Sequence, residues 1–355
     1  MKRELAALAA LGLATLVQAA PAPPLPAPLT GVVTAKAETT PVGTANDDAA
    51  DDPAIWRNSR FLDRSLIVAT DKKAGLYVYG LDGKVRQFLP AGRLNNVDLL
   101  DMGRAGIIVV ASDRNDEANA KLQLYRLDPR SAQLVPLGAV SGGAGEAYGV
   151  CLLRRGRTLF AFSVLKQGAI HQVRIDLAAA GRIGTSPVGT IVRSMKLPTQ
   201  TEGCVADPRT ATLYVGEEDV GIWAFDARSN GPVNGKLVAP VDGLQLVADV
   251  EGLALLPTGA RSGWLIASSQ GDNAYAVYAL PSLRPAGRFR IAAGALGSTE
   301  ETDGIAISNG SFGKEFPGGL FVAQDGQNAP AAQNFKLVSW REVLTATSAK
   351  PTKAR

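Results

Sequence analysis

The chain has 355 residues, of which 46% are hydrophobic and 20% are charged, so it can bury a large core. Its formal net charge of +4 is small and dispersed, and the sequence contains no basic helix and no aromatic-stacking motif. Both features argue against nucleic acid as a partner. A mildly basic balance is compatible with an anionic small molecule.

Residues 1–20 have the layout of a cleaved secretory signal peptide. A short charged start precedes an apolar stretch that ends near Val17, and Ala19 and Ala20 supply the small residues of a cleavage site. The stretch is shorter than the roughly 20 apolar residues that a membrane anchor needs. We therefore expect a secreted or periplasmic protein, a Pro-rich linker at 21–30, and no membrane attachment after cleavage.

After the linker, one motif recurs six times at intervals of about 50 residues, a period typical of a β-propeller. Each copy starts with an acidic or polar residue, often before Gly, and continues into an apolar run. In chain order the copies start at Asp51-Asp52, Asn95-Asn96, Tyr148-Gly149, Glu202-Gly203, Glu251-Gly252 and Asp303-Gly304. In this alignment Tyr148 and Asn96 occupy the positions that Glu202, Glu251 and Asp303 occupy in other copies.

Each copy continues in the same order, with a second apolar run, a polar loop, an alternating third run and a weaker fourth run. In the first copy these are residues 65–69, 71–73, 76–81 and 85–89. Alternation with a period of two, bounded by Gly, Asp and Pro, indicates half-buried strands. The chain is therefore predicted to be all-β, a six-bladed β-propeller with four- to five-stranded antiparallel blades.

The sixth copy lacks a fourth strand after Leu337-Val338-Ser339-Trp340. Residues 31–35 could supply it, so that an N-terminal strand closes the ring and removes exposed sheet edges. We therefore expect one propeller domain at 31–345, a basic tail at 346–355, and a monomer.

Topology predicts where the polar residues gather. In an antiparallel blade, the start of the first strand and the loop between the second and third strands lie at the same end. Around the channel at this end we expect the carboxylates of Asp51, Asp52, Glu202, Glu217, Glu218, Asp249, Glu251, Asp303 and Asp325, and the cations of Lys72, Lys73, Arg114 and Lys166.

The two signs of charge are separated by blade, because the cations fall in the first three copies and most carboxylates in the last three. Crowded carboxylates repel one another unless a hard cation neutralises them, and oxygen-rich clusters select Ca²⁺. Lysine and arginine opposite them would clamp phosphate oxygens. Together they suggest a polyanionic substrate bridged by metal.

Several motifs in register closely resemble the β-propeller phytases known from Bacillus, over essentially the whole chain after the linker. They are Asp51-Asp52-Pro53-Ala54-Ile55-Trp56, Leu94-Asn95-Asn96-Val97-Asp98, Thr201-Glu202-Gly203, Glu217-Glu218-Asp219, Ala267-Ser268-Ser269-Gln270-Gly271, Thr302-Asp303-Gly304-Ile305, Phe321-Val322-Ala323-Gln324-Asp325-Gly326 and Gln333-Asn334-Phe335-Lys336.

The resemblance implies a calcium-dependent 3-phytase. Such an enzyme hydrolyses phosphate monoesters of myo-inositol hexakisphosphate (phytate) by direct attack of a metal-bound water, and releases inorganic phosphate and lower inositol phosphates. The substrate is expected as its calcium complex. By resemblance, the cleaved phosphate is held by Lys72, Arg114, Lys166 and Tyr148, and the catalytic Ca²⁺ ions by Asp51, Glu202, Glu218, Asp249, Glu251 and Asp303.

The resemblance also implies further sites. Lys73, Asn95 and Asn96 are expected near a second phosphate that is bound without being cleaved, and a structural calcium is expected at Asp52 with the main-chain carbonyls of Pro53 and Val97. Asn328 is expected among the metal ligands. The chain departs from the family at Gly297, where the family has an Asp that helps hold a structural calcium; Glu300, Glu301 and Asn328 could substitute.

The cysteines and the histidine bear on other mechanisms. Cys151 and Cys204 lie in the first strands of consecutive blades, which are not hydrogen-bonded neighbours, so we favour two buried free thiols over a disulfide. Cys151 and Arg157 match the spacing of thiol phosphatases, but that chemistry needs a loop leading into a helix, and this segment indicates a strand and its hairpin. The single histidine, His171, excludes phosphatases that need paired histidines.

Two other function classes stay open at this stage. A calcium-dependent six-bladed propeller lactonase or esterase would share the fold and the metal, but it would not need four cations facing the metal. A non-catalytic binding propeller would share the fold and release no phosphate with any metal.

Overall fold

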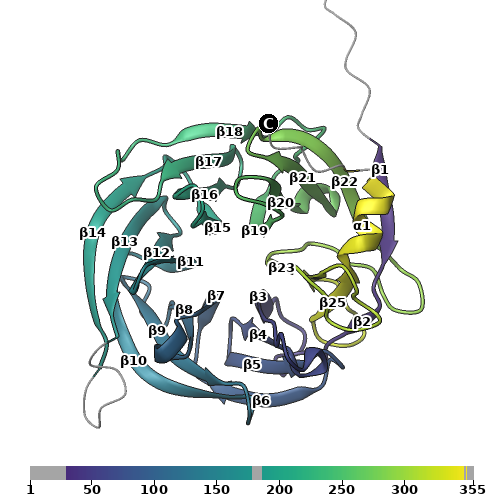
Figure 1. The fold of residues 1–355 in the computed structure, drawn as a ribbon, viewed down its shortest axis with the longest axis horizontal. Helices are drawn as coiled ribbons and strands as arrows, with labels where there is room; N and C mark the ends of the chain where they lie inside the picture. The colour runs from purple at the N-terminus through teal and green to yellow at the C-terminus, as the bar shows by residue number, and fades with distance from the viewer. Residues whose placement is uncertain (1–28, 178–185, 348, 350–355) are drawn as a thin grey trace, which may run out of the picture.

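A computed structural model describes residues 29–177, 186–347 and 349. The predicted signal peptide, most of the linker and most of the basic tail lie outside these residues. Six small β-sheets stand in a ring around a central channel, and each forms one blade (Figure 1). The predicted six-bladed β-propeller is therefore confirmed.

Within each blade the strands follow one another from the channel outward, as antiparallel neighbours. The first three blades contain β3 (Ala50–Trp56), β4 (Leu66–Asp71), β5 (Gly75–Gly80) and β6 (Val85–Pro90); β7 (Leu94–Asp101), β8 (Ile107–Asp113), β9 (Asn119–Asp128) and β10 (Gln133–Ala144); and β11 (Ala147–Arg155), β12 (Thr158–Leu165), β13 (Ala169–Asp176) and β14 (Val188–Lys196). The last three contain β15 (Thr201–Asp207), β16 (Thr212–Glu217), β17 (Gly221–Asp226) and β18 (Lys236–Pro240); β19 (Val250–Pro257), β20 (Gly263–Ser269), β21 (Ala274–Leu280) and β22 (Arg284–Ala292); and β23 (Ile305–Ser308), β24 (Leu320–Asp325) and β25 (Asn334–Ser339).

The apolar runs form the strands that are covered on both faces. Every residue of the second strands β4, β8 and β24 is buried, because blades pack on either side of them. The outermost strand β6 has mostly exposed residues, in keeping with its weak hydrophobic pattern. Burial thus increases from the outer edge of the disc toward the middle of each blade. This is why the second run of each copy is the most continuously apolar.

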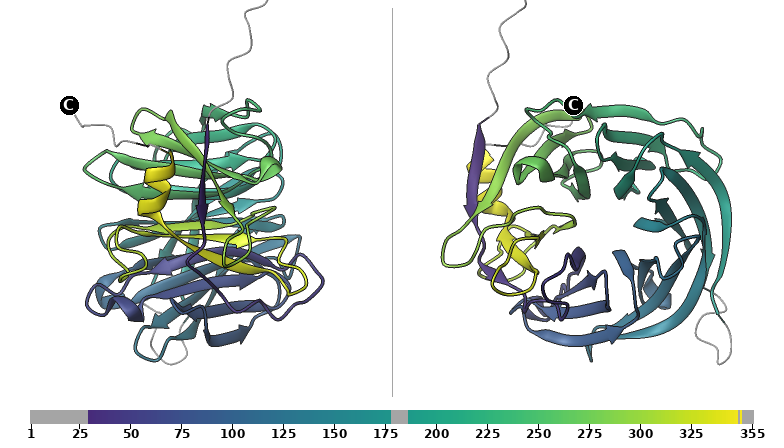
Figure 2. Two further views of the ribbon diagram at one scale, coloured as in Figure 1. Left: turned by 90° about the vertical axis from the view of Figure 1, so that its right-hand side faces the viewer. Right: turned by 180° about the vertical axis from the view of Figure 1, so that it is seen from behind.

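An N-terminal strand closes the ring, as predicted, but it is not the predicted segment. Residues 31–35 do not complete the sixth blade; β1 (Thr30–Thr34) instead runs parallel to β22 on the outer edge of blade five. The strand that closes blade six is β2 (Ala37–Glu38), antiparallel to β25. The two ends of the chain therefore clasp two adjacent blades, and Figure 2 shows β1 crossing the side of the disc.

The C-terminal segment forms a helix that the strand pattern did not predict. α1 (Trp340–Thr347) begins at the residue expected to end the last strand, and it buries Trp340 and Val343. A short apolar run does not distinguish a strand from the first turn of a helix. The helix lies so close to β1 that a Cβ atom on Gly31 would be 2.7 Å from the carbonyl oxygen of Ala346. Within the described residues, no helix has both the length and the apolar character needed to cross a membrane.

The expectation of two free thiols is wrong, because Cys151 on β11 and Cys204 on β15 form a disulfide with a Cα–Cα distance of 5.7 Å. These strands share no ladder hydrogen bonds. They converge because the innermost strands of adjacent blades crowd around a narrow channel, a distance that a strand pattern does not reveal. The disulfide also removes the thiol that a Cys151-based phosphatase would need, and Arg157 lies in the turn after β11.

The glycines of the repeated motif mark close contacts between adjacent blades. A Cβ atom on Gly149, Gly203, Gly252 or Gly304 would lie 1.9, 2.1, 2.7 or 2.4 Å from the carbonyl oxygen of Glu202, Glu251, Asp303 or Asp51, respectively. Each of these oxygens belongs to the next blade around the ring, and the last contact joins blade six to blade one. The glycines therefore leave room for a neighbouring backbone.

We predict that Gly203→Ala lowers the free energy of unfolding by about 1–3 kcal/mol, because its methyl group would overlap the Glu251 carbonyl. Urea unfolding followed by circular dichroism measures the change. Gly297→Ala is the matched control, since its methyl group would meet only the end of the Lys336 side chain, with Nζ nearest at 3.5 Å. Equal stability of the two variants would contradict the role given to the inter-blade contact.

Candidate active site

The backbone brings two positions of each blade to one end of the channel, which we call the rim. The ladder between the first two strands starts at Ala50↔Asp71, Leu94↔Asp113, Ala147↔Leu165, Thr201↔Glu217 and Val250↔Ser269, and in all five blades the register then shifts at a bulge. The bulge holds the predicted rim residue, and bulges re-aim side chains. By this register Asn95, not Asn96, corresponds to Glu202 and Glu251, which corrects the sequence alignment by one residue.

The second contribution is the residue that follows each second strand. In ring order these are Lys72, Arg114, Lys166, Glu218, Gln270 and Gly326. The residue before each of them ends the strand and in several blades has a structural role. Glu217, for example, accepts hydrogen bonds from the Thr199 amide at 2.8 Å and from Trp223 Nε1 at 2.9 Å. Adjacent acids in one turn thus differ, because one supports the turn and the next points to the rim.

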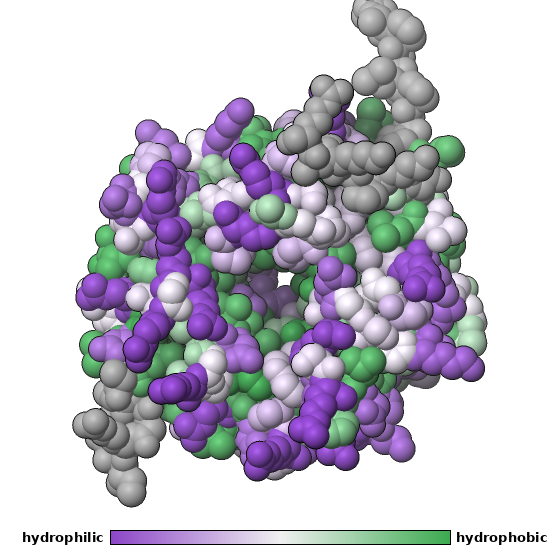
Figure 3. Space-filling view, in the orientation of Figure 1, coloured by the Kyte–Doolittle hydropathy of each residue, from purple (hydrophilic) through white to green (hydrophobic). Residues whose placement is uncertain are grey.

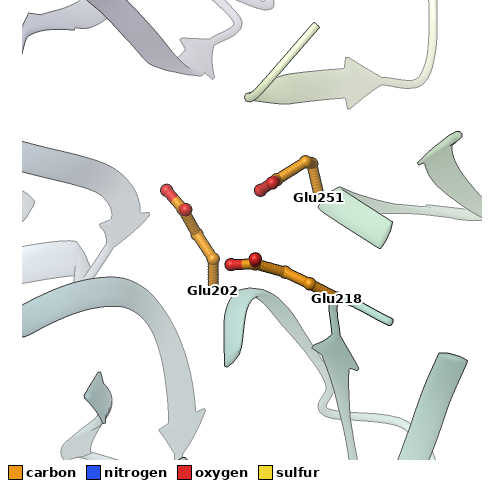
Figure 4. Close-up of side chains that lie close together, drawn as sticks. All are labelled: Glu202, Glu218 and Glu251. Carbon is orange, nitrogen blue, oxygen red and sulfur yellow. The ribbon is translucent and has the colours of Figure 1, made fainter. Parts of the chain in front are cut away.

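Three carboxylates meet at this rim. Glu202 on β15, Glu218 after β16 and Glu251 on β19 point toward one another (Figure 4), and one oxygen of each lies within 4.8 Å of the others. All three are buried. Burial raises the pKa of Glu202 and Glu251 well above the usual range, with further increase from neighbouring carboxylates such as Asp51 and Asp303. Burial also raises the pKa of Glu218, to about 6.

Lys72 lies among the other predicted ligands. Its Nζ is 3.0 Å from Asp51, 2.9 Å from Asp303 and 2.7 Å from the exposed Asp48. Burial opposes the charge of the ammonium, but the surrounding carboxylates outweigh it and raise the pKa of Lys72. Burial raises the pKa of Asp303 to about 7, although Lys72 counteracts it. One cation therefore offsets only part of the negative charge here.

The carboxylates are suited to bind a hard cation, because several of their buried oxygens accept no hydrogen bond. Asp51 Oδ1, Glu218 Oε1 and Glu251 Oε2 are buried and have no hydrogen-bond partner. A buried carboxylate oxygen without a partner has a high free-energy cost, which a coordinated cation would remove. Asp249 lies just before β19 and its charge contributes to the raised pKa of Glu218, although it is outside the tight group of three.

Two of the predicted cations, Arg114 and Lys166, form a second group on blades two and three. The Arg114 guanidinium lies over the Tyr148 ring with its Cζ 5.2 Å from the centroid, and Lys166 Nζ lies 5.1 Å from the same centroid. Cations are attracted to the face of an aromatic ring. Tyr148 thus holds two like charges close together, and Glu146 pairs with Arg114 from the side.

Asn95 connects the two groups. Its Nδ2 donates to Glu202 Oε1 at 2.7 Å and its Oδ1 accepts from Arg114. Asn96 is buried beside it, and its main-chain N–H donates a hydrogen bond to Ser112 Oγ. Lys73 lies farther out, with an exposed side chain 3.3 Å from Asp47. Of the three residues predicted to hold a second phosphate, Asn95 and Asn96 therefore lie at the centre of the rim and Lys73 at its periphery.

Below the rim, the channel is a cavity of about 300 Å³ lined by the inner strands of all six blades. The space-filling view shows the opening at the centre of the ring (Figure 3). Asp52, Pro53 and Val97 line it together, so the structure brings these three predicted residues to one place. The Asp52 carboxylate accepts a hydrogen bond from the Val97 amide at 3.0 Å.

Asn328 lies apart from the group of three carboxylates. Its Oδ1 accepts from Lys336 Nζ at 3.1 Å, and the fully buried Lys336 also pairs with Asp325 at 3.2 Å and with Glu38. Gly297 lies beside this ammonium. Near Gly297, where the family has a ligand of a structural calcium, the described residues therefore place the Lys336 ammonium between the carboxylates of Asp325 and Glu38.

Two partners of the site were not predicted, Glu146 of Arg114 and Asp48 of Lys72. Both lie in irregular segments just before an inner strand, and neither belongs to the repeated motif. A sequence signal existed only for Glu146, which lies two residues before Tyr148, but an acid near a strand start is common in turns.

Comparison with known proteins identifies the family. The Phytase family matches residues 3–353 of the chain. A 3-phytase from Bacillus subtilis (strain 168) is 38% identical over 326 residues, which cover 88% of this chain and 84% of that protein. A chain from a solved structure of a mitotic checkpoint complex is 14% identical, with a TM-score of 0.48 over 91% of this chain and 87% of that one. By the first two comparisons, this chain belongs to the phytase family.

Proposed function

We propose that this protein is a calcium-dependent 3-phytase that hydrolyses phosphate monoesters of phytate, taken as its calcium complex. The observation that supports the proposal most is the division of one rim into two groups, buried carboxylates with unpartnered oxygens and cations held on an aromatic ring. Family membership supports the same activity.

Calcium would be held by Glu202, Glu218 and Glu251, with Asp51, Asp303 and Asp249 next to them, because Ca²⁺ favours several oxygen ligands. When bound, it would neutralise negative charge on the substrate and acidify water beside it. Asn95 keeps Glu202 directed at this place through the 2.7 Å hydrogen bond. A structural calcium in the channel would be held by Asp52, Pro53 and Val97.

Arg114, Lys166 and Tyr148 would bind the phosphate that is cleaved. Arginine offers a planar fork and lysine a point charge to phosphate oxygens. Burial, and then the charge of Glu202, raises the pKa of the Tyr148 phenol, so this hydroxyl stays protonated and can donate a hydrogen bond. Lys72 stays cationic because the surrounding carboxylates outweigh the effect of burial on its pKa, and it would contact the phosphate from the side of the carboxylates.

The alternatives fit these observations less well. A lactonase or esterase acts on uncharged groups and would not need Lys72, Arg114 and Lys166 on one rim, and a binding scaffold would not need buried carboxylates with unpartnered oxygens.

We also propose that the protein resides in an oxidising compartment, the periplasm or the exterior, which the Cys151–Cys204 disulfide supports.

We predict that Glu218→Gln weakens calcium binding about tenfold or more, because it removes a charged ligand from the buried group. Isothermal titration calorimetry with Ca²⁺ gives the affinity directly, and phosphate release from phytate should fall with it. Chelation of calcium should abolish release by the unsubstituted protein.

Glu315→Gln is the matched control, because it makes the same substitution at an exposed glutamate between β23 and β24, at the other end of the blades. It should keep calcium affinity and activity within about twofold, as expected for a screened surface charge. Full phosphate release after chelation, or an equal loss in both variants, would contradict the proposed metal site.

We further predict a graded effect at Tyr148. Tyr148→Phe removes only the hydroxyl and should raise KM for phytate about fivefold, the cost of roughly one hydrogen bond. Tyr148→Leu also removes the ring that holds Arg114 and Lys166 together, and should raise KM by about a further fivefold or more. Steady-state kinetics at saturating calcium separate the two effects; identical KM values for Phe and Leu would show that the ring has no such role.

A further inference from the structure

A second cluster of cations lies at the opposite end of the blades from the candidate active site. Arg104, Arg154, Arg157 and Arg174 line a cavity of about 790 Å³ between blades two and three. Arg154 lies near the end of β11 and Arg157 in the turn that follows, and the other end of β11 holds Tyr148. At about 3.3 Å per residue, the seven steps along the strand from Tyr148 to Arg155 span roughly 23 Å. This cavity is therefore separate from the rim.

Among the residues that the structure describes, no ion pair neutralises the four arginines of this cavity. Arg154 donates from Nε to the Gly156 carbonyl and from Nη1 to the Asp101 carbonyl, both at 2.9 Å. These contacts fix its guanidinium without cancelling the charge. Within the described part of the chain, none of the four arginines has a carboxylate within 4.0 Å. Elsewhere on the same end, Arg209 and Arg228 pair with Asp207 and Asp226.

The rest of the lining is suited to a compact ligand. Met102 and Ile175 are buried and form apolar wall, and Val188 at the edge is 58% exposed. Asp176 is the one carboxylate among the described lining residues, against four guanidinium groups. The volume lies within the roughly 300–1,000 Å³ typical of small-molecule pockets.

We propose that this cavity is a second anion-binding site, for a small ligand that carries several phosphate or sulfate groups. Guanidinium groups bind such oxygens with paired, charge-assisted hydrogen bonds, and four of them lining one pocket repel one another until an anion is bound. The site is distinct from the catalytic rim and does not use calcium. Its ligand is either a soluble polyphosphorylated molecule or the phosphate of a lipid headgroup, which share this chemistry.

The test uses the full chain and myo-inositol hexasulfate, a hexa-anion without phosphate esters to cleave, in the presence of a calcium chelator. Isothermal titration calorimetry should detect binding by the unsubstituted protein, weakened at high salt. Arg157→Gln/Arg174→Gln should lower the affinity by about tenfold for each arginine, because each loses a charge-assisted contact. Phosphate release from phytate with calcium should be unchanged, so failure of the proposed catalytic function would be seen separately.

Arg261→Gln/Arg284→Gln is the matched control, because it removes two exposed arginines of blade five at the same end of the disc, one from the turn before β20 and one from the start of β22. It should bind the hexasulfate normally. Sedimentation with vesicles of phosphatidylcholine and phosphatidylglycerol gives the source of the ligand: binding of the free anion indicates a soluble one, and binding of vesicles alone indicates a lipid.

Either form of binding supports the site if the cavity variant loses it and the control keeps it. No binding of either probe by the unsubstituted protein, or the same loss in both double variants, would overturn it. Arg174→Lys tests the guanidinium group itself, because it keeps the positive charge and removes the planar set of donors. An affinity equal to that of the unsubstituted protein would exclude the guanidinium contact proposed here.

Discussion

The candidate active site depends on how closely the inner strands approach one another at one end of the channel. There, Gly149, Gly203, Gly252 and Gly304 each pack against a backbone carbonyl of the next blade, with no space for a side chain. The side chain just before each glycine consequently projects toward the channel beside its neighbours. The same contact, between Gly304 and Asp51, closes the ring, so the fold and the convergence of the rim residues have one cause.

Convergence has an electrostatic cost, because it buries several carboxylates within reach of one another. The raised pKa values of Glu202, Glu218 and Glu251 reflect first their burial and then repulsion by neighbouring carboxylates. Cations on neighbouring elements offset part of this cost, and the unpartnered oxygens show where compensation is still lacking. A site of this kind favours a divalent ion and an anionic substrate together, since each reduces the unfavourable interactions of the other.

The fold and the composition of the rim could be predicted because both follow from the repeat. A propeller blade has a fixed strand order, so the positions of Lys72, Arg114, Lys166 and Glu218 at one end follow from topology alone. Details that depend on one residue of register could not be predicted, since a slip by one position turns every side chain to the other face. The inner bulge therefore put Asn95, rather than Asn96, opposite Glu202.

The other differences arise where distant segments meet. The Cys151–Cys204 disulfide, the closing strand β2 and the pairing of Lys336 with Glu38 all depend on distances around the ring, which no local pattern encodes.

The pair between Lys336 and Glu38 shows how such a contact affects stability. Partial burial opposes ionisation of Glu38, but hydrogen bonds from Lys336 and Asn334 outweigh it and lower its pKa. This carboxylate therefore stabilises the fold once the pH is above the ordinary pKa of glutamate, and the contribution is lost as the pH falls through the lowered value. Because Lys336 also pairs with Asp325, directly before Gly326 at the rim, the clasp of the N-terminal strand and the last blade of the site share one buried cation.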